Sequence, residues 1–270
     1  MRHISLKPLL KKIFADADGK NIRKRLIKAH KKLAAMQVAD RKNHTDKNGP
    51  NKWKPLKTRL TNVLGKKCWY TEVELTGATL VVDHYRPVCA YWWLSYDAEN
   101  YRVSCPWANS HEHNAEHGCA GGKGEQFPLL PPGIAATGKN RLRMERPVIL
   151  DPCRKADCDL LAFQADGRPI LNPAFIGDPM ATKRVEDSKI LLNLDHPDFN
   201  SKRETLCRDI ATDVNTHEQL PEGAASRKEI RDKLAGKLEP TAPYSTAARF
   251  YLKLHRHLDW VEKLLSSAGT

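Results

Sequence analysis

The sequence of 270 residues lacks features that mark several whole classes of protein. It has no apolar run near the roughly 20 residues that a bilayer-spanning helix needs, so we expect no membrane partner. Its start, MRHISLKPLL, lacks the apolar core of a secretory signal. The seven cysteines are odd in number and scattered, which argues against a disulfide scaffold and favours reduced thiols in the cytoplasm. Only 15 glycines and 17 prolines exclude collagen and low-complexity chains.

Acidic residues are scarce at the beginning of the chain. Residues 1–67 contain 20 Lys and Arg but only four Asp and Glu, so their net charge is +16. The remaining residues carry −3, and the whole chain +13. This asymmetry predicts a polyanionic partner, most simply nucleic acid. A solvated basic helix, or one that faces an acidic protein, would explain the same charges.

The pattern of apolar residues divides the chain into three regions. Residues 5–14, 21–37 and 55–64 have helical spacing, whereas residues 40–54 have no period and are predicted to be a loop. Residues 68–75 and 79–85 predict a hairpin with its turn at 76–78, and 101–105 a further strand. Most of 110–140 is expected to be loop, and 148–173 a short strand and turn. The rest is mainly helical, most clearly 246–266, with the apolar stripe Phe250, Leu254, Leu258, Val261 and Leu265.

The predicted fold class is therefore α+β. We expect a basic helical region over residues 1–65, a small core over 66–130 that holds the chemistry, and a mostly helical region over 131–270 that docks a partner.

An Asp-His pair at the end of the second predicted strand carries the most chemical information. The carboxylate of Asp83 can hold a divalent metal while the imidazole of His84 takes a proton from water. Phosphodiester hydrolysis needs both functions, but such a dipeptide also occurs by chance. The downstream string NYRVSCPWAN adds a second observation, which is a fixed spacing of polar residues. Asn100 precedes Cys105 by five residues and Asn109 by nine.

With these spacings the sequence resembles the HNH (ββα-metal) endonucleases. The resemblance implies that His84 is the general base, that Asp83 and Asn109 hold one catalytic Mg²⁺ or Mn²⁺, and that Asn100 orients the base. It also implies a small ββα core embedded between the two helical regions.

Several longer strings narrow the resemblance to one branch. They are VDHYRPV, YWWLSYDAENYRVSCPWAN, GKGEQFPLL, ILDPC and RVEDSKILLNLDHP, spread from about residue 53 to 203. Together they are similar to the nucleases of Septu anti-phage defence systems (PtuB-type), including retron-associated versions. The resemblance implies nucleic acid as substrate, with DNA or RNA left open and DNA favoured, and an ABC/SMC-like ATPase as partner. The retron version adds a reverse transcriptase and its RNA–DNA product.

The sequence departs from the wider HNH pattern at the two CxxC motifs that bind structural zinc. Cys68 is followed by Thr71 where the second cysteine would stand, and Cys105 is followed by Ala108. Two thiolates do not complete a tetrahedral zinc site, so no structural zinc is expected. The alternative is that other ligands complete it, from the set His111, His113, His117 and Cys119.

Basic residues outside the motif are candidates for contacts to phosphate. Those near the core are Arg86, Arg102 and Lys123, and those of the N-terminal region are Lys24, Lys28 and Lys31. Trp92 and Trp93 could stack on bases, although core packing is the commoner role of such residues. An HNH fold that keeps only nucleic-acid binding or scaffolding is the alternative function. An isolated homing or restriction-type enzyme is a third, for which the chain shows no sequence-reading module.

Overall fold

The computed structural model describes residues 1–75, 79–110, 112–114 and 117–267. Helices predominate, and the strands within these ranges form three small antiparallel pairs, so the fold is of the mixed α and β class that the sequence predicts. The predicted turn at 76–78 lies outside the described residues.

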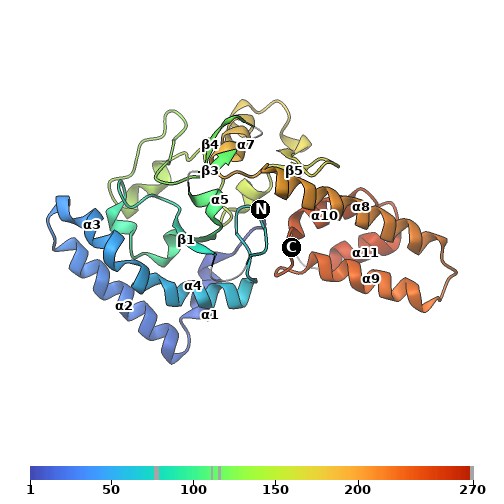
Figure 1. Cartoon of the computed structure of the whole chain (residues 1–270), viewed down its shortest axis with the longest axis horizontal. Coiled ribbons are helices and arrows are strands. Elements are labelled where there is room, and N and C mark those ends of the chain that lie inside the picture. Colours follow the sequence, from blue (N-terminus) through green and yellow to red (C-terminus); the bar gives the residue numbers. More distant parts are fainter. Residues whose placement is uncertain (76–78, 111, 115–116, 268–270) are drawn as a thin grey trace.

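Four helices form the N-terminal region (Figure 1): α1 (Leu6–Ile13), α2 (Ala17–Ala34), α3 (Val38–Asn48) and α4 (Pro50–Leu64). Asp16 caps the start of helix α2, and its carboxylate accepts a hydrogen bond from the backbone N–H of Gly19. It buries one apolar stripe and leaves its basic residues in solvent. Helix α4 packs between α2 and the first strand, which places the basic region directly against the core.

The prediction of a loop over residues 40–54 is wrong. Residues 38–48 form α3, although Thr45 is its only buried side chain among those described. Helix α4 starts at Pro50, in the first turn, where the missing N–H of a proline costs nothing. The predicted start, Pro55, lies inside the helix. Gly49 keeps right-handed helical angles, so the Asn-Gly-Pro string joins two helices instead of forming a turn.

The central sheet pairs β1 (Val81–His84) with β2 (Tyr101–Ser104). Residues 68–75 do not form the expected first strand of a hairpin; the structure gives them a single isolated bridge between Lys67 and Glu74. The short helix α5 (Pro106–Asn109) follows β2 after one residue and contacts β1. A strand–strand–helix unit therefore lies at the centre of the molecule. Its neighbours are the pair β3 (Glu112–Asn114) and β4 (Cys119–Gly121).

The C-terminal half begins with the short helices η3 (Lys139–Met144) and α6 (Lys155–Cys158) and a small strand pair, β5 (Leu161–Phe163) and β6 (Pro169–Leu171). Five longer helices follow. They are α7 (Pro179–Leu191), α8 (Pro197–Gln219), α9 (Ala225–Leu238), α10 (Ser245–Lys253) and α11 (Asp259–Ser267). Helices α8 to α11 project to one side of the molecule (Figure 1). The predicted helix over 246–266 is interrupted between α10 and α11, and Leu254 of its apolar stripe is 62% exposed at the break.

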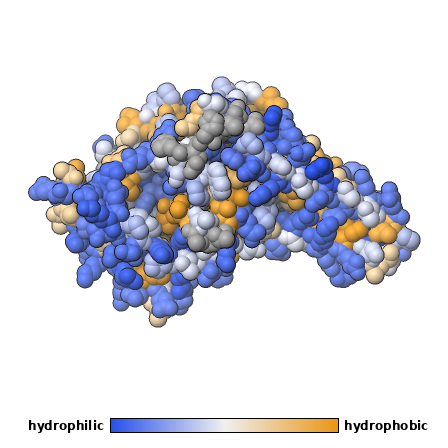
Figure 2. Space-filling model, in the orientation of Figure 1, coloured by the Kyte–Doolittle hydropathy of each residue, from blue (hydrophilic) through white to orange (hydrophobic). Residues whose placement is uncertain are grey.

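One hydrophobic core joins the central unit to both helical regions. Large aromatic side chains, among them Trp69, Tyr85 and Tyr101, are fully buried in it. Hydrophilic residues cover most of the face seen in Figure 2, and hydrophobic ones gather in patches. Within the described residues, no helix has the length and apolar character that crossing a bilayer requires.

Candidate active site

The strand–strand–helix unit brings the predicted catalytic residues into one region. In the β1–β2 register Asp83 pairs with Arg102 and His84 with Tyr101. Helix α5 starts at Pro106 and ends at Asn109. The helix contacts β1, so Asn109 lies at the end of an element packed against the strand that carries Asp83 and His84.

Asp83 is 3% exposed and is held by two hydrogen bonds. The Tyr70 hydroxyl donates to Oδ2 at 2.6 Å, and the Lys123 ammonium donates to Oδ1 at 2.9 Å. Lys123 is completely buried and also donates to the backbone carbonyl of His84 at 2.7 Å. These contacts fix the orientation of the carboxylate. Each oxygen keeps a further lone pair for another ligand.

The local sequence Gly-Lys-Gly explains how Lys123 turns inward. Gly122 and Gly124 both have positive φ angles, 89° and 49°, which side-chain-bearing residues rarely adopt. The backbone N–H groups of Lys123 and Gly124 donate to the carbonyls of Ala108 and Asn109, at 3.0 and 2.9 Å. The turn is therefore attached to α5 while its lysine reaches β1.

The imidazole of His84 has a fixed orientation. Its Nε2 lies 2.9 Å from the carbonyl oxygen of Ser95, which can only accept, so Nε2 carries the proton and Nδ1 keeps a free lone pair. Trp53 of α4 and Tyr101 of β2 contact the ring edge-on, at centroid distances of 4.8 and 5.0 Å. Burial lowers the pKa of His84 against the opposing effect of the Ser95 hydrogen bond, which keeps the ring neutral at pH 7. A neutral ring with a free nitrogen can accept a proton.

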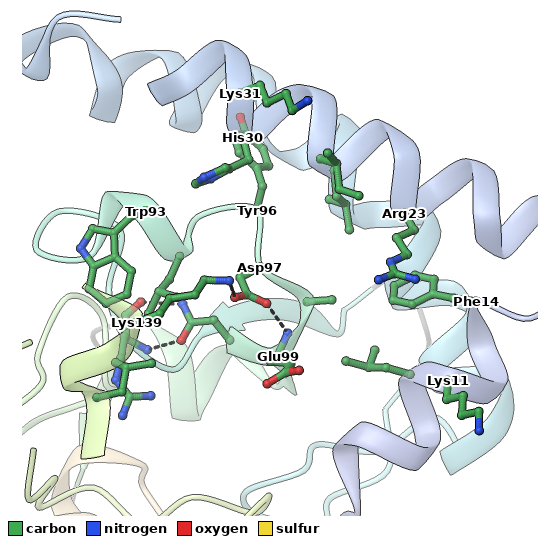
Figure 3. A pocket seen from close by; sticks show the side chains of 18 of the residues that line it. Lys11, Phe14, Arg23, His30, Lys31, Trp93, Tyr96, Asp97, Glu99 and Lys139 are labelled. Atoms are coloured by element: carbon green, nitrogen blue, oxygen red, sulfur yellow. Dashed lines mark hydrogen bonds and ion pairs between the residues drawn. The ribbon is translucent and has the colours of Figure 1, made fainter. Parts of the chain in front are cut away.

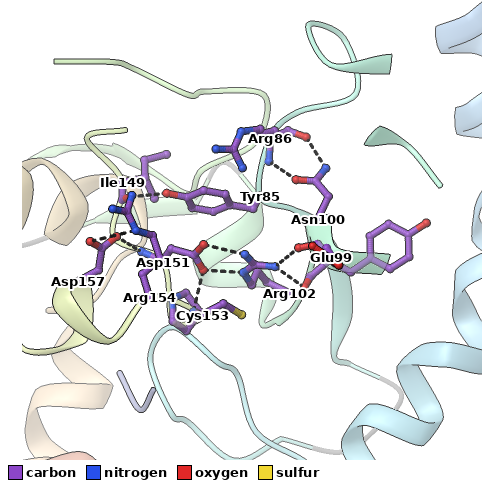
Figure 4. A network of polar contacts seen from close by, with 12 residues as sticks. Tyr85, Arg86, Glu99, Asn100, Arg102, Ile149, Asp151, Cys153, Arg154 and Asp157 are labelled. Atoms are coloured by element: carbon purple, nitrogen blue, oxygen red, sulfur yellow. Dashed lines mark hydrogen bonds and ion pairs between the residues drawn. The ribbon is translucent and has the colours of Figure 1, made fainter. Parts of the chain in front are cut away.

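Asn100 joins the two ends of the segment that connects β1 to β2 (Figure 4). Its side-chain oxygen accepts from the backbone N–H of Arg86, and its amide donates to the Arg86 carbonyl, both at 2.9 Å. This connection starts directly after His84 and contains Ser95. Asn100 therefore closes the loop that contains Ser95, and the Ser95 carbonyl in turn contacts His84.

Two of the basic residues expected to contact phosphate lie inside the protein. Arg102 is 3% exposed and forms two hydrogen bonds of 2.7 Å with the carboxylate of Asp151 (Figure 4). Lys123 is bound to Asp83 as described above. Neither presents its charge at the surface, because each cation is needed to balance a buried carboxylate. Arg86 is half-buried and pairs with Glu145 at 2.7 Å.

The basic residues of α2 remain in solvent. Lys24, Lys28 and Lys31 are all exposed, but only Lys31 lines the large cleft beside the core. Trp92 lies under the Arg41 guanidinium, 3.7 Å from the ring centroid, whereas Trp93 lines the same cleft as Lys31.

The four positions of the CxxC motifs meet in the core. Cys68, Thr71, Cys105 and Ala108 are at most 2% exposed, and the Thr71 hydroxyl lies 3.8 Å from the Cys105 sulfur. A hydrogen bond to Cys68, together with burial, raises the pKa of Cys105 well above its usual value. Among the described residues no group of three or more His, Cys, Asp or Glu side chains could hold a metal.

The alternative zinc ligands are placed only in part. His117 pairs with Asp195 at 2.7 Å, and Cys119 is half-buried on β4. His111 lies outside the described residues, and the side chain of His113 is not described.

A catalytic divalent metal would have two protein ligands in this arrangement. The Asp83 carboxylate has lone pairs to spare, and the half-buried Asn109 amide makes no hydrogen bond to another described side chain or backbone group. Carboxylate and amide oxygens are the donors that Mg²⁺ and Mn²⁺ prefer. The donor types of these two residues therefore suit such an ion, while the Lys123 ammonium already balances the charge of Asp83.

Sequence reasoning did not identify Tyr70, Ser95 or Trp53 as parts of the site. Each contacts Asp83 or His84 from outside strand β1. Ser95 lies in one of the strings quoted above, but nothing in that string marks it as a partner of His84. Comparison with protein-family models gives no match, and comparison with curated proteins gives no significant match.

Proposed function

We propose that this chain is a metal-dependent endonuclease of the HNH type that hydrolyses phosphodiester bonds of nucleic acid, with DNA as the favoured substrate. The observation that carries the proposal is the neutral His84 ring. Its Nε2–H is bound by the Ser95 carbonyl, and it follows the fixed carboxylate of Asp83 on one strand. A scaffold alone has no need to hold a histidine in this tautomer beside a metal-binding carboxylate.

The residues have separate tasks in this reaction. His84 Nδ1 takes a proton from the attacking water, and the Ser95 carbonyl stabilises the imidazolium that results. Asp83 and Asn109 would hold a divalent cation, which supplies positive charge for the phosphate and the leaving 3′ oxygen when bound. Tyr70 and Lys123 keep the carboxylate in one orientation, so little reorganisation precedes the reaction.

The proposed setting is an anti-phage defence complex of the Septu type. In it, the C-terminal helices dock on an ABC/SMC-like ATPase, with a retron reverse transcriptase and its RNA–DNA product as further partners in the retron-associated version. Support comes from the sequence strings of that branch and from the projecting arm of α8 to α11, whose exposed Leu254 is available for a contact.

A catalytically silent subunit is the second candidate. The observation in its favour is the Lys123 ammonium, which already balances the charge of Asp83 without a metal. The two candidates differ in one outcome, which is metal-dependent cleavage.

The test is a nuclease assay with plasmid DNA, single-stranded DNA and structured RNA, each in Mg²⁺, Mn²⁺ and EDTA. The matched variants are His84→Ala and His84→Gln. We expect metal-dependent cleavage that falls at least about a hundredfold in both variants, because general-base catalysis contributes roughly 10²–10⁴. Melting temperature is measured alongside, and His84→Gln controls for the gap that truncation leaves beside Trp53.

Cleavage that survives both substitutions, or that needs no metal, would contradict the proposal. If the isolated chain cuts nothing, the same assay is run on the complex co-purified with its ATPase partner. Absence of cleavage there leaves the silent subunit as the function.

A further inference from the structure

A large open cleft lies beside the candidate active site, between the N-terminal helices and the core (Figure 3). Its volume is about 1060 Å³. Helices α1 and α2 form one wall, and the segment from Trp93 to Asn100 with η3 forms the other. That segment also contains Ser95, whose carbonyl holds His84, so the cleft and the candidate base share one structural element.

Apolar and aromatic side chains line part of the cleft. Phe14 and Ile27 contribute from the helical wall, and Ile27 is 49% exposed. Trp93 faces them from the opposite wall (Figure 3) and is supported by Tyr91, with ring centroids 5.8 Å apart. Apolar side chains left in solvent at a concave site are typical of a surface that binds something.

The positive charges of the cleft divide into two groups. Arg86 pairs with Glu145 and Lys139 with Asp97, so these two cations are neutralised within the protein. Lys11, Arg23 and Lys31 are exposed on the helical wall and have no ion-pair partner among the described residues. Arg23 and Lys31 stand about 12 Å apart along α2 at 1.5 Å per residue. The helical wall thus carries an uncompensated positive row beside apolar side chains.

We propose that this cleft binds an unpaired stretch of nucleic acid, with its phosphates on Lys11, Arg23 and Lys31 and its bases against Phe14, Ile27 and Trp93. A duplex presents phosphates but keeps its base faces stacked, so the apolar surface would have no partner. Single strands offer both chemistries at once, and stacking on aromatic rings is their usual mode of binding. The proposal rests on the proposed function for the identity of the ligand and adds that the strand entering the site is single.

The test measures binding of the full chain to fluorescent twelve-residue oligonucleotides by anisotropy in EDTA, where no cleavage occurs. The probes are dT, rU, an abasic DNA strand with the same phosphates, and a duplex of the same length. The cleft variant is Lys11→Glu/Arg23→Glu/Lys31→Glu. The control, Lys24→Glu/Lys28→Glu/Lys32→Glu, makes the same charge change on exposed residues of α2 that do not line the cleft.

We expect the cleft variant to bind dT or rU at least about tenfold more weakly than the control does, and comparison of dT with rU shows whether the strand is DNA or RNA. Trp93→Ala should weaken dT or rU several-fold and leave the abasic strand unchanged, because stacking contributes about 1–3 kcal/mol per base. Circular dichroism confirms that the variants remain folded.

Three results would overturn the inference. They are equal losses in the cleft and control variants, equal affinity for abasic and base-containing strands, and displacement of the oligonucleotide by an acidic peptide at lower concentration than by dT or rU. If binding follows the expected pattern but no nucleic acid is cleaved, the cleft proposal is supported and the proposed nuclease function is contradicted. If the cleft variant still cleaves duplex DNA in full and binding is not selective, the nuclease function is supported and the cleft proposal is contradicted.

Discussion

At the scale of single residues, the ion pair between Lys123 and Asp83 governs the candidate site. Both side chains are almost completely withdrawn from water, and the lysine has carbonyl acceptors as well as the carboxylate. Taking two charges out of water is costly, and their attraction offsets that cost only while both are present. The pair therefore ties the geometry of Asp83 to the stability of the core.

The substitution Lys123→Met tests this coupling. It leaves the Asp83 carboxylate buried without its cation, so we expect a loss of about 3–5 kcal/mol in the free energy of unfolding. Urea denaturation at pH 7 gives the value. The control is Lys139→Met, which breaks the largely exposed pair with Asp97 and should cost no more than about 1 kcal/mol. Equal stability of the two variants would show that Lys123 does not hold Asp83.

Residue-level roles were only partly predictable from the sequence. The Asp83–His84 dipeptide and its spacing to Asn109 pointed to one region, and the fold places them on packed neighbouring elements. Lys123 and Arg102 were expected at the surface because lysine and arginine usually are. Their burial depends on carboxylates supplied by distant segments, and no local pattern encodes that.

At the scale of elements, the central β1–β2 pair is attached to the C-terminal half through Arg102 on β2. Its guanidinium forms two hydrogen bonds with the carboxylate of Asp151, which also accepts one from the backbone N–H of Cys153 at 2.8 Å (Figure 4). Burial raises the pKa of Asp151, but the charge and hydrogen bonds of Arg102 outweigh it and leave the pKa below its usual 3.8. The ionised carboxylate is thus the form that stabilises the fold.

This contribution should depend on pH with a definite sign. A carboxyl group whose folded-state pKa is depressed stabilises the protein above its unfolded pKa, and that stability is lost as the pH falls through the folded value. Asp151→Asn should therefore cost about 3–5 kcal/mol at pH 7. The difference from the unsubstituted chain should shrink below pH 3.8. Urea unfolding at pH 7, 5 and 3 measures both; a constant difference would contradict the assignment.

Sequence patterns predicted elements well where periodicity is local and poorly where pairing is remote. Helix α2 falls close to the predicted helix over 21–37. The segment 148–173 was predicted as one short strand and a turn, and it contains the strand pair β5–β6. Helix α3 was missed because it has almost no apolar face, with Thr45 as its one described buried residue. Strand β1 pairs with β2 across a long connection instead of with the adjacent 68–75, and such non-local pairing leaves no mark in local alternation.

At the scale of the whole molecule, charge is segregated by region. The helices α1 to α4 and the following turn carry +16 over residues 1–67, while the remainder carries −3. Of these helices, α1 and α2 form one wall of the cleft, and the core segment that holds His84 forms much of the other. The long-range attraction of a polyanion would therefore draw it toward the side of the molecule where the cleft lies.

The salt dependence of binding distinguishes the effect of where the basic residues lie from the effect of the total charge. Each phosphate neutralised on a single strand contributes about 0.7 to the slope of log affinity against log salt concentration. Reversing Lys11, Arg23 and Lys31 should therefore lower the slope for dT or rU by about 2. The control at Lys24, Lys28 and Lys32 alters net charge equally, yet it touches no phosphate in the proposed complex and should lower the slope by less than about 1. Titrations from 50 to 300 mM NaCl measure both slopes. Equal reductions would mean that the helices attract nucleic acid only through their overall charge, because contact in the cleft is the one feature that distinguishes the two sets.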